Sequence, residues 1–186
     1  INSFSEEISF TKTHAVDMGL WLPGELAAKS RLKSFLSKKV FNYSKDRNDP
    51  ILDGTSRMSP YLAIGAISNR RCLLEALKLN NFELQTGNKG VCKWIDEIIW
   101  REFYKNIMSY FPRVSMNQPF NMSTVSIPWR HNEEEIKAWK NGKTGFPLID
   151  AAMHQLHYEG WMHNRLRMVV SMFFTKYLLH DWRIGE

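Results

Sequence analysis

The sequence is poor in cysteine and has no long hydrophobic run. Cys72 and Cys92 are the two cysteines among 186 residues, too few for a disulfide framework, and their isolation is typical of a reducing compartment. No run of roughly 18 apolar residues occurs, which excludes a membrane-spanning helix. The chain opens at Ile1 without an apolar leader and stops at Glu186, so we expect it to be a piece of a longer protein.

Several functional motifs are also missing. Strand-like alternation of apolar and polar residues is essentially absent, and so is the glycine-rich strand-to-helix turn of dinucleotide-binding proteins. His154, His157 and His163 form an H-x2-H-x5-H pattern, but no cysteine or carboxylate completes a zinc-site spacing. Residue content leaves a Ser/His/Asp hydrolase open, yet no nucleophile-elbow sequence is present. The pattern therefore favours neither a zinc site nor a hydrolase.

Aromatic residues, in contrast, are abundant. The chain has seven Trp, six Tyr and eleven Phe, with 44% hydrophobic and 24% charged residues, which is ordinary globular composition for one domain with a full core. An aromatic-rich core is the simplest explanation. Each indole N–H needs a hydrogen-bond partner, however, and several tryptophans lie beside arginines and amides, which indicates a recognition surface as well.

The net charge of +6 is concentrated in one stretch. Residues 29–47 hold seven basic residues and one acidic residue, whereas the other 167 residues hold 18 of each sign and sum to zero. A localised basic strip is a footprint for a polyanion such as nucleic acid. A solvated helix face explains the same pattern, so both interpretations stay open.

Hydrophobic spacing of three and four residues predicts an all-α fold. Ser59 is the expected N-cap of a helix that has Pro60 at its first position, and Ser68 the cap of the next. Residues 1–21 read as a linker, and 42–58 and 112–132 as loops. The helices are expected at about 25–41, from 59, at 68–79, 90–111, 132–141, 147–160 and 162–179.

Polar residues interrupt the apolar face of the helix at 90–111. Trp94, Glu97, Arg101 and Tyr104 are spaced to share one face, with Trp100 on its flank. Glu97 and Arg101 could form a plain helix-stabilising pair worth about 0.3–0.5 kcal/mol. The flanking indoles weaken that reading, because an aromatic wall with a carboxylate and a guanidinium resembles a site for a flat heteroaromatic group.

Two further stretches carry anion-binding chemistry. Residues 161–168 put two arginines, an amide and an indole in the first turns of a helix, where anionic groups are favoured, although the arginines could instead cap acidic helix ends. Residues 53–60 supply three hydroxyls and backbone N–H groups just before a helix start, which suits phosphate oxygens. Thr and Ser are also common helix caps, so this second signal is weak alone.

Four motifs in order carry a family resemblance: Tyr43 to Arg47 with residues 55–59, then W-x-x-E-I-I-W-R-E-F-Y at 94–104, G-K-T-G-F-P at 142–147, and G-W-M-H-N-R-L-R-M at 160–168. From about Leu22 to its last residue, the chain resembles the FAD-binding helical domain of the DNA photolyase/cryptochrome family. It is most similar to bacterial class I cyclobutane-pyrimidine-dimer photolyases. The resemblance implies that residues 22–186 form part of this multi-helical domain, truncated at its C-terminus and lacking the N-terminal α/β antenna domain.

The resemblance also implies site residues. The FAD-binding residues would be Tyr43, Thr55, Ser56, Arg57, Met58, Ser59, Trp94, Arg101, Asn164 and Arg167. Those facing DNA would be Arg47, Glu97, Trp100, Tyr104, Trp161, Asn164, Arg165 and Met168. Within these sets, Glu97, Trp100 and Asn164 would serve catalysis. Trp129 and Trp182 would belong to the tryptophan chain that re-reduces the flavin.

The implied activity is light-dependent repair of cyclobutane pyrimidine dimers, a carbon–carbon lyase reaction in which excited reduced FAD donates an electron to a flipped-out dimer. The implied partner is damaged double-stranded or single-stranded DNA, bound by a cytoplasmic monomer without membrane contact, and a folate or deazaflavin antenna pigment would lie on the missing domain. A cryptochrome-type blue-light photoreceptor and a flavin-free nucleic-acid-binding module stay open as alternatives. No metal is implied.

Overall fold

The computed structural model describes residues 16–186, and within them the fold is helical. The only β pairing in this range is an isolated bridge between Arg130 and His180. The α-helices are α1 (Gly24–Ser37), α2 (Tyr43–Asp46), α3 (Ser59–Ala63), α4 (Asn69–Leu79), α5 (Lys89–Tyr110), α6 (Glu133–Lys140), α7 (Pro147–Glu159) and α8 (Asn164–Met172). The expected all-α class is confirmed. The linker expected at 1–21 lies mostly outside the described residues.

Short 3₁₀ and π turns join these helices. They are η1 (Met18–Leu20), η2 (Lys39–Asn42), η3 (Pro112–Met116), η4 (Met122–Thr124), the π turn η5 (Phe173–Tyr177) and η6 (Trp182–Ile184). Among the residues that the structure covers, no helix is long and apolar enough to cross a membrane.

The first group of helices, α1 to α5, forms what we call the N-terminal cluster. Ala28, Leu32 and Phe35 fall on one face of α1 at spacings of four and three, and α5 presents Trp94 and Ile98 at the same period. These faces bury one another in a core that also includes residues from η2, α3 and α4. Burial of these apolar faces, rather than helix propensity, holds the short helices in place.

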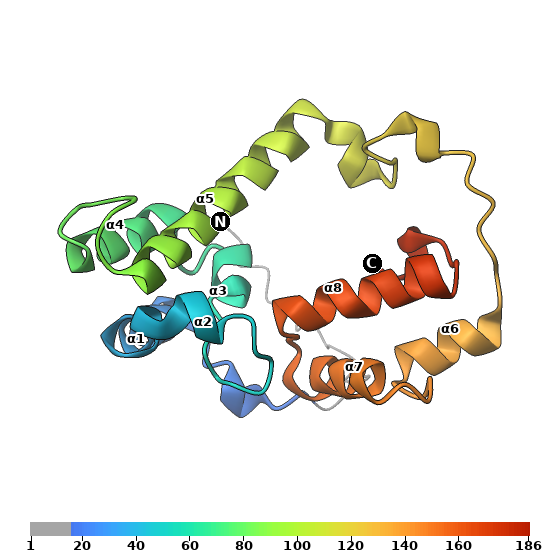
Figure 1. The fold of residues 1–186 in the computed structure, drawn as a ribbon, viewed down its shortest axis with the longest axis horizontal. Helices are drawn as coiled ribbons and strands as arrows, with labels where there is room; N and C mark the ends of the chain where they lie inside the picture. Colours follow the sequence, from blue (N-terminus) through green and yellow to red (C-terminus); the bar gives the residue numbers. More distant parts are fainter. Residues whose placement is uncertain (1–15) are drawn as a thin grey trace, which may run out of the picture.

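The second group, α6 to α8 with η5 and η6, forms the C-terminal cluster around its own core. That core is built from Ile136, Trp139, Ile149, Ala152, Met153, Met162, Leu166, Val170 and Phe174. It shares no residue with the first. In Figure 1, α5 leads away from the N-terminal cluster through η3 and η4, and a long irregular segment then descends to α6, α7 and α8.

Three expected boundaries differ from the structure. The helix expected at 25–41 breaks at Lys38 (φ −141°), and η2 continues the chain. Ser59 is the first residue of α3 rather than its capping residue, and no side chain caps that helix. The helix expected at 162–179 begins at Asn164 and changes into the π turn at Phe173. In addition, the loop expected at 42–58 contains the short helix α2.

Candidate functional site

The segment from Tyr43 to Ser59 ties the two clusters to each other. Arg47, which follows α2, forms an ion pair with Glu97 of α5, and its guanidinium lies 5.4 Å from the Tyr43 ring centroid. Lys93 is a second, weaker partner of Glu97 at 3.7 Å. The Glu97 carboxylate is therefore oriented by two charge-assisted contacts, one from the end of α2 and one from within α5.

The same segment reaches α7 and α8. Arg165 donates from Nε and Nη2 to Asn48 Oδ1, at 3.0 and 2.6 Å. Arg57 pairs with Glu159 at 2.9 Å, and its guanidinium lies 4.5 Å from the Trp161 ring. In Figure 1 the loop between α2 and α3 runs beside the start of α8. The structure thus brings predicted residues from three distant stretches of the chain together here.

Local backbone geometry shapes the hydroxyl-bearing part of this loop. Gly54 is buried, and a Cβ there would overlap the Asp46 side chain and approach the Asp46 carbonyl oxygen to 3.1 Å. Arg57 has a positive φ of 49°, unusual for a non-glycine residue. Thr55 and Ser56 lie between these two points and are partly exposed, and Met58 is buried. The turn therefore carries two partly exposed hydroxyls, of which Ser56 Oγ accepts from the Met58 backbone N–H at 3.4 Å.

The exposed face of α5 carries aromatic side chains beside Glu97. Trp100 is 49% exposed and Tyr104 61% exposed, and their ring centroids lie 6.0 Å apart. Phe103 packs edge-on against Trp100 at 5.3 Å. This face of α5 has a hollow of about 510 Å³, lined by Glu97, Trp100, Arg101, Tyr104, Lys105 and Met108. A separate hollow of about 570 Å³ lies between α1 and α4.

Arg101 and Trp94 are less exposed than the aromatic side chains of this face. Arg101 donates from Nη2 to the Leu62 carbonyl oxygen at 3.1 Å, while its buried Nε has no hydrogen-bond partner. Trp94 is only 4% exposed and packs against Phe35 at 5.1 Å in the N-terminal core. Arg101 thus offers an unused donor, whereas the Trp94 indole is largely occupied by core packing.

The start of α8 holds the second group of predicted residues. His163 Nδ1 accepts from the Arg165 backbone N–H and caps the helix. Met168 Sδ lies 4.0 Å from Asn164 Nδ2 and 3.9 Å from Arg165 Nη1. Arg167 donates from Nε to the Met162 carbonyl oxygen at 3.2 Å and borders a hollow of about 300 Å³ together with Met168. This hollow shares no lining residue with the one on α5.

The groups with shifted pKa values in this region include Tyr43 and His163. Burial raises the pKa of Tyr43 to about 12, although the nearby Arg47 guanidinium opposes that shift. Burial also lowers the pKa of His163, and the positive charge of Arg165 adds to the effect. Both side chains are therefore neutral at neutral pH, and His163 acts as a cap and not as a cation.

Trp129 and Trp182 lie on neighbouring segments. The Arg130 backbone N–H donates to the Leu179 carbonyl oxygen at 2.8 Å. The buried His180 ring then contacts the Arg130 carbonyl oxygen at 3.0 Å and Glu135 Oε2 at 3.1 Å. These bonds fix the residue after Trp129 beside the start of η6, which contains Trp182.

Sequence reasoning missed four residues that organise the region: Asn48, Glu135, Glu159 and His180. Each of them pairs with a residue at least 45 positions away in the sequence. Glu135 has a second partner, Arg130, only five positions away. Asn48 lies in the loop expected at 42–58, but no local pattern signals its partner. Within residues 16–186, His154, His157 and His163 do not belong to any group of three side chains that could hold a metal ion.

Comparison with known proteins gives a consistent answer. A family model described as the FAD-binding domain of DNA photolyase matches residues 94–186. A deoxyribodipyrimidine photo-lyase of Neurospora crassa is 45% identical over 168 residues, covering 90% of this chain and 27% of that protein. The chain spans about a third of the length of most curated relatives that it matches.

Solved structures agree in fold. A bacterial class III photolyase from Agrobacterium tumefaciens superimposes with a TM-score of 0.84 at 36% identity, over 90% of this chain and 34% of that one. A cryptochrome from Synechocystis superimposes with a TM-score of 0.79 at 28% identity, over 96% and 36%. Together with the order of the motifs and the convergence of Arg47, Glu97 and Arg165, these matches show that the chain belongs to the DNA photolyase family and carries part of its FAD-binding domain.

Proposed function

We propose that this chain supplies flavin-holding and DNA-facing surfaces of a light-driven lyase that splits cyclobutane pyrimidine dimers. The observation that carries the proposal is the convergence at the 43–59 segment, where Arg47 pairs with Glu97 and Asn48 binds Arg165. At this segment a carboxylate, an amide and two guanidiniums meet, and the exposed Trp100 follows Glu97 by three residues on α5. Similarity to the Neurospora photo-lyase supports the same chemistry.

The residues present fit an FAD molecule in two respects. The turn at Thr55 and Ser56 presents partly exposed hydroxyls, and such groups bind ribose and phosphate oxygens. The buried Arg101 Nε has an unused N–H, which a ring or phosphate acceptor would satisfy. The remaining proposed contacts are Tyr43, Arg57, Met58, Ser59, Trp94, Asn164 and Arg167. When bound, FAD would supply light absorption and the donated electron.

The DNA side of the proposal rests on α5 and the start of α8. Exposed Trp100 and Tyr104 offer flat surfaces that replace the stacking lost when a damaged pair leaves the duplex. Glu97, which is paired with Arg47, would accept from the N–H edge of a pyrimidine. Arg165 would neutralise phosphate, and Met168 would contact the dimer. Trp161, only 8% exposed, would offer an edge beneath Arg57.

We further propose that Trp129 and Trp182 relay electrons toward the flavin. The pairing of residues 130 and 179 brings their segments side by side, and electron transfer depends on such closeness. The protein would act as a cytoplasmic monomer on double-stranded or single-stranded damaged DNA. The free thiols Cys72 and Cys92 support a reducing compartment. An antenna pigment of the folate or deazaflavin type would be held outside this chain.

The direct test uses the natural full-length protein that contains this sequence. We expect bound flavin absorbance after purification and, on illumination with dimer-containing DNA, a loss of dimers relative to a dark sample. Equal dimer content in light and dark would reject repair and, with flavin still bound, would favour the photoreceptor function suggested by the likeness to the Synechocystis cryptochrome. Protein without flavin would favour the nucleic-acid-binding alternative.

A Trp100→Ala substitution tests the proposed DNA face. Loss of the exposed indole should reduce the preference for damaged over intact DNA by about 1–3 kcal/mol, because base–aromatic stacking has that size. Tyr110→Ala is the matched control, since Tyr110 is 79% exposed on the same helix and does not line the α5 hollow. Competition binding with dimer-containing and intact oligonucleotides measures the preference, and an unchanged value in Trp100→Ala would remove this residue from the site.

A further inference from the structure

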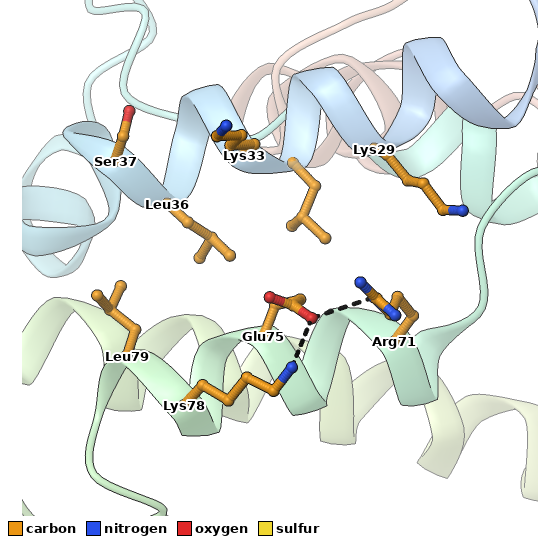
Figure 2. A pocket seen from close by; sticks show the side chains of 9 residues that line it. Lys29, Lys33, Leu36, Ser37, Arg71, Glu75, Lys78 and Leu79 are labelled. Atoms are coloured by element: carbon orange, nitrogen blue, oxygen red, sulfur yellow. Dashed lines mark hydrogen bonds and ion pairs between the residues drawn. The ribbon is translucent and has the colours of Figure 1, made fainter.

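A groove between α1 and α4 lies apart from the proposed site. It has a volume of about 570 Å³ and is lined by Lys29, Leu32, Lys33, Leu36, Ser37, Arg71, Glu75, Lys78 and Leu79. Figure 2 shows the two helices running along its opposite sides with side chains from both directed into the space between them. None of these residues lines the hollow on α5 or the one at α8.

The rim of this groove is basic. Four cations and one carboxylate line it, a local net charge of 4 − 1 = +3. Glu75 is already paired with Arg71 at 3.1 Å and with Lys78 at 3.2 Å, as the dashed lines in Figure 2 mark. Lys29 pairs with Glu25 at 2.6 Å, outside the lining. Even with Glu25 included, the rim keeps a charge of +2.

The floor of the groove is apolar and partly open. Leu32 is buried, Leu36 is half-buried and Leu79 is 40% exposed. Leu26, 82% exposed, precedes Lys29 by three residues and Lys33 by seven, so it lies on the same face of α1 as these rim lysines. A strip of leucines flanked by cations on both helices is the complement of an amphipathic segment with acidic flanks.

We propose that the groove binds an acidic amphipathic helix of a partner protein, an interaction beyond the flavin and DNA chemistry proposed above. Such a helix would place leucines at helical spacing on Leu32, Leu36 and Leu79, and its carboxylates would face Lys33 and Lys78. The 14 residues of α1 form a side about 21 Å long, enough for three to four turns of partner helix. Nucleic acid fits the charge but not the floor, because phosphates would leave the leucines in water.

The experiment uses the natural full-length protein that contains this sequence and a synthetic probe peptide. The peptide is an amidated helix with leucines at i, i+3 and i+7 and glutamates on both flanks. Anisotropy of the labelled peptide is measured against the protein. We expect saturable binding that weakens with added salt. The double substitution Lys33→Glu with Lys78→Glu should weaken binding roughly tenfold, in keeping with two lost and reversed exposed charge contacts. Lys140→Glu with Lys176→Glu, the same charge change on the C-terminal cluster, should leave it unchanged.

Two measurements separate the peptide from nucleic acid. Replacing the three probe leucines with serine should abolish saturable binding, because the apolar floor then gains nothing. A DNA duplex of mixed sequence should not displace the peptide from the groove at low salt. If the serine peptide binds as well as the leucine peptide, if the duplex competes fully, or if the two charge-reversal pairs weaken binding equally, the proposal is wrong. Loss of flavin binding or repair would leave these outcomes unaffected, so the two proposals fail separately.

Discussion

His163 shows how one side chain serves both local structure and burial. It is 2% exposed, caps α8 through Nδ1, and lies between the residues predicted to face flavin and DNA. Because burial lowers its pKa, it is neutral when α8 is properly capped. The cap needs an acceptor at this position and has no need of a charge.

Substitutions at His163 separate the effect of the helix cap from the effect of the lowered pKa. Below about pH 6.5 the unfolded chain binds a proton at this residue before the folded chain does, so stability should fall as the pH drops from there. His163→Asn keeps an acceptor for the Arg165 N–H and should flatten this part of the pH profile. His163→Ala should also flatten it but cost about 1 kcal/mol for the lost cap. Thermal melts between pH 5 and 8 measure both effects, and an equally steep acid loss in His163→Asn would assign the pH dependence elsewhere.

The packing of single helices depends on close backbone approaches. Gly90, near the start of α5, lies against η2, where a Cβ would overlap the Val40 and Phe41 carbonyl oxygens and approach the Phe41 carbonyl carbon to 2.7 Å. No side chain can yield at this contact because the neighbouring atoms are backbone. Glycine is therefore required here for steric reasons. A left-handed backbone is not the reason, because the φ of Gly90 is not in the left-handed region.

We accordingly expect Gly90→Ala to destabilise the protein, the opposite of its usual effect. In an open helix position alanine would be favoured by about 1 kcal/mol, whereas overpacking against backbone should cost about 1–3 kcal/mol. Lys89→Ala, at the exposed neighbouring position, should change stability by less than about 0.5 kcal/mol. Urea titrations of the three proteins measure the difference, and a more stable Gly90→Ala protein would show that η2 moves freely.

Helices with a clear period were predicted well because their boundaries have local causes. Helix α5 lies within one residue of its expected range, and Pro112 follows its end. Helix α7 begins at Pro147 and ends at Glu159, within one residue of its expected range, and the left-handed Gly160 follows it. The breaks at Lys38 and Phe173 were not predictable, because the apolar period continues across both and tertiary packing decides the backbone there.

For the site, motif resemblance named residues but not their contacts. The Glu97–Arg101 pairing suggested by helical spacing is not what the structure contains, since Glu97 pairs with Arg47 and Lys93 while Arg101 donates to Leu62. Pairings across dozens of residues leave no periodic trace in a sequence. The basic strip at 29–47 is likewise divided by the fold between the α1 groove and the Glu97 contact.

At the scale of the whole molecule, the two clusters have separate cores joined mainly by polar contacts. The ties include Arg57 with Glu159, Arg165 with Asn48, the Trp21 indole N–H, which donates to the Glu159 carbonyl oxygen, and the backbone bond from Asp17 to Tyr158. Contacts of this kind contribute little compared with buried apolar surface. We therefore expect the two clusters to open separately.

Hydrogen exchange followed by mass spectrometry tests this expectation. Peptides from α5 and from α7 and α8 should show different protection, and Arg57→Met with Arg165→Met should lower protection in α7 and α8 by several-fold while leaving α5 unchanged. Arg70→Met with Arg113→Met, which removes two cations away from these ties, is the matched control. One common exchange rate for both clusters at every denaturant concentration would show a single cooperative unit.

The loop between α2 and α3 links ligand binding thermodynamically to the stability of the whole molecule. Arg47, Asn48 and Arg57 of this loop contact α5, α8 and α7. A ligand that binds the loop on several sides therefore also stabilises the association of the N-terminal and C-terminal clusters. Ligand binding at the loop and the association of the two clusters are therefore coupled. Binding of the ligand raises the melting temperature, and a change that destabilises the contacts of α8 lowers the affinity for the ligand by the same factor.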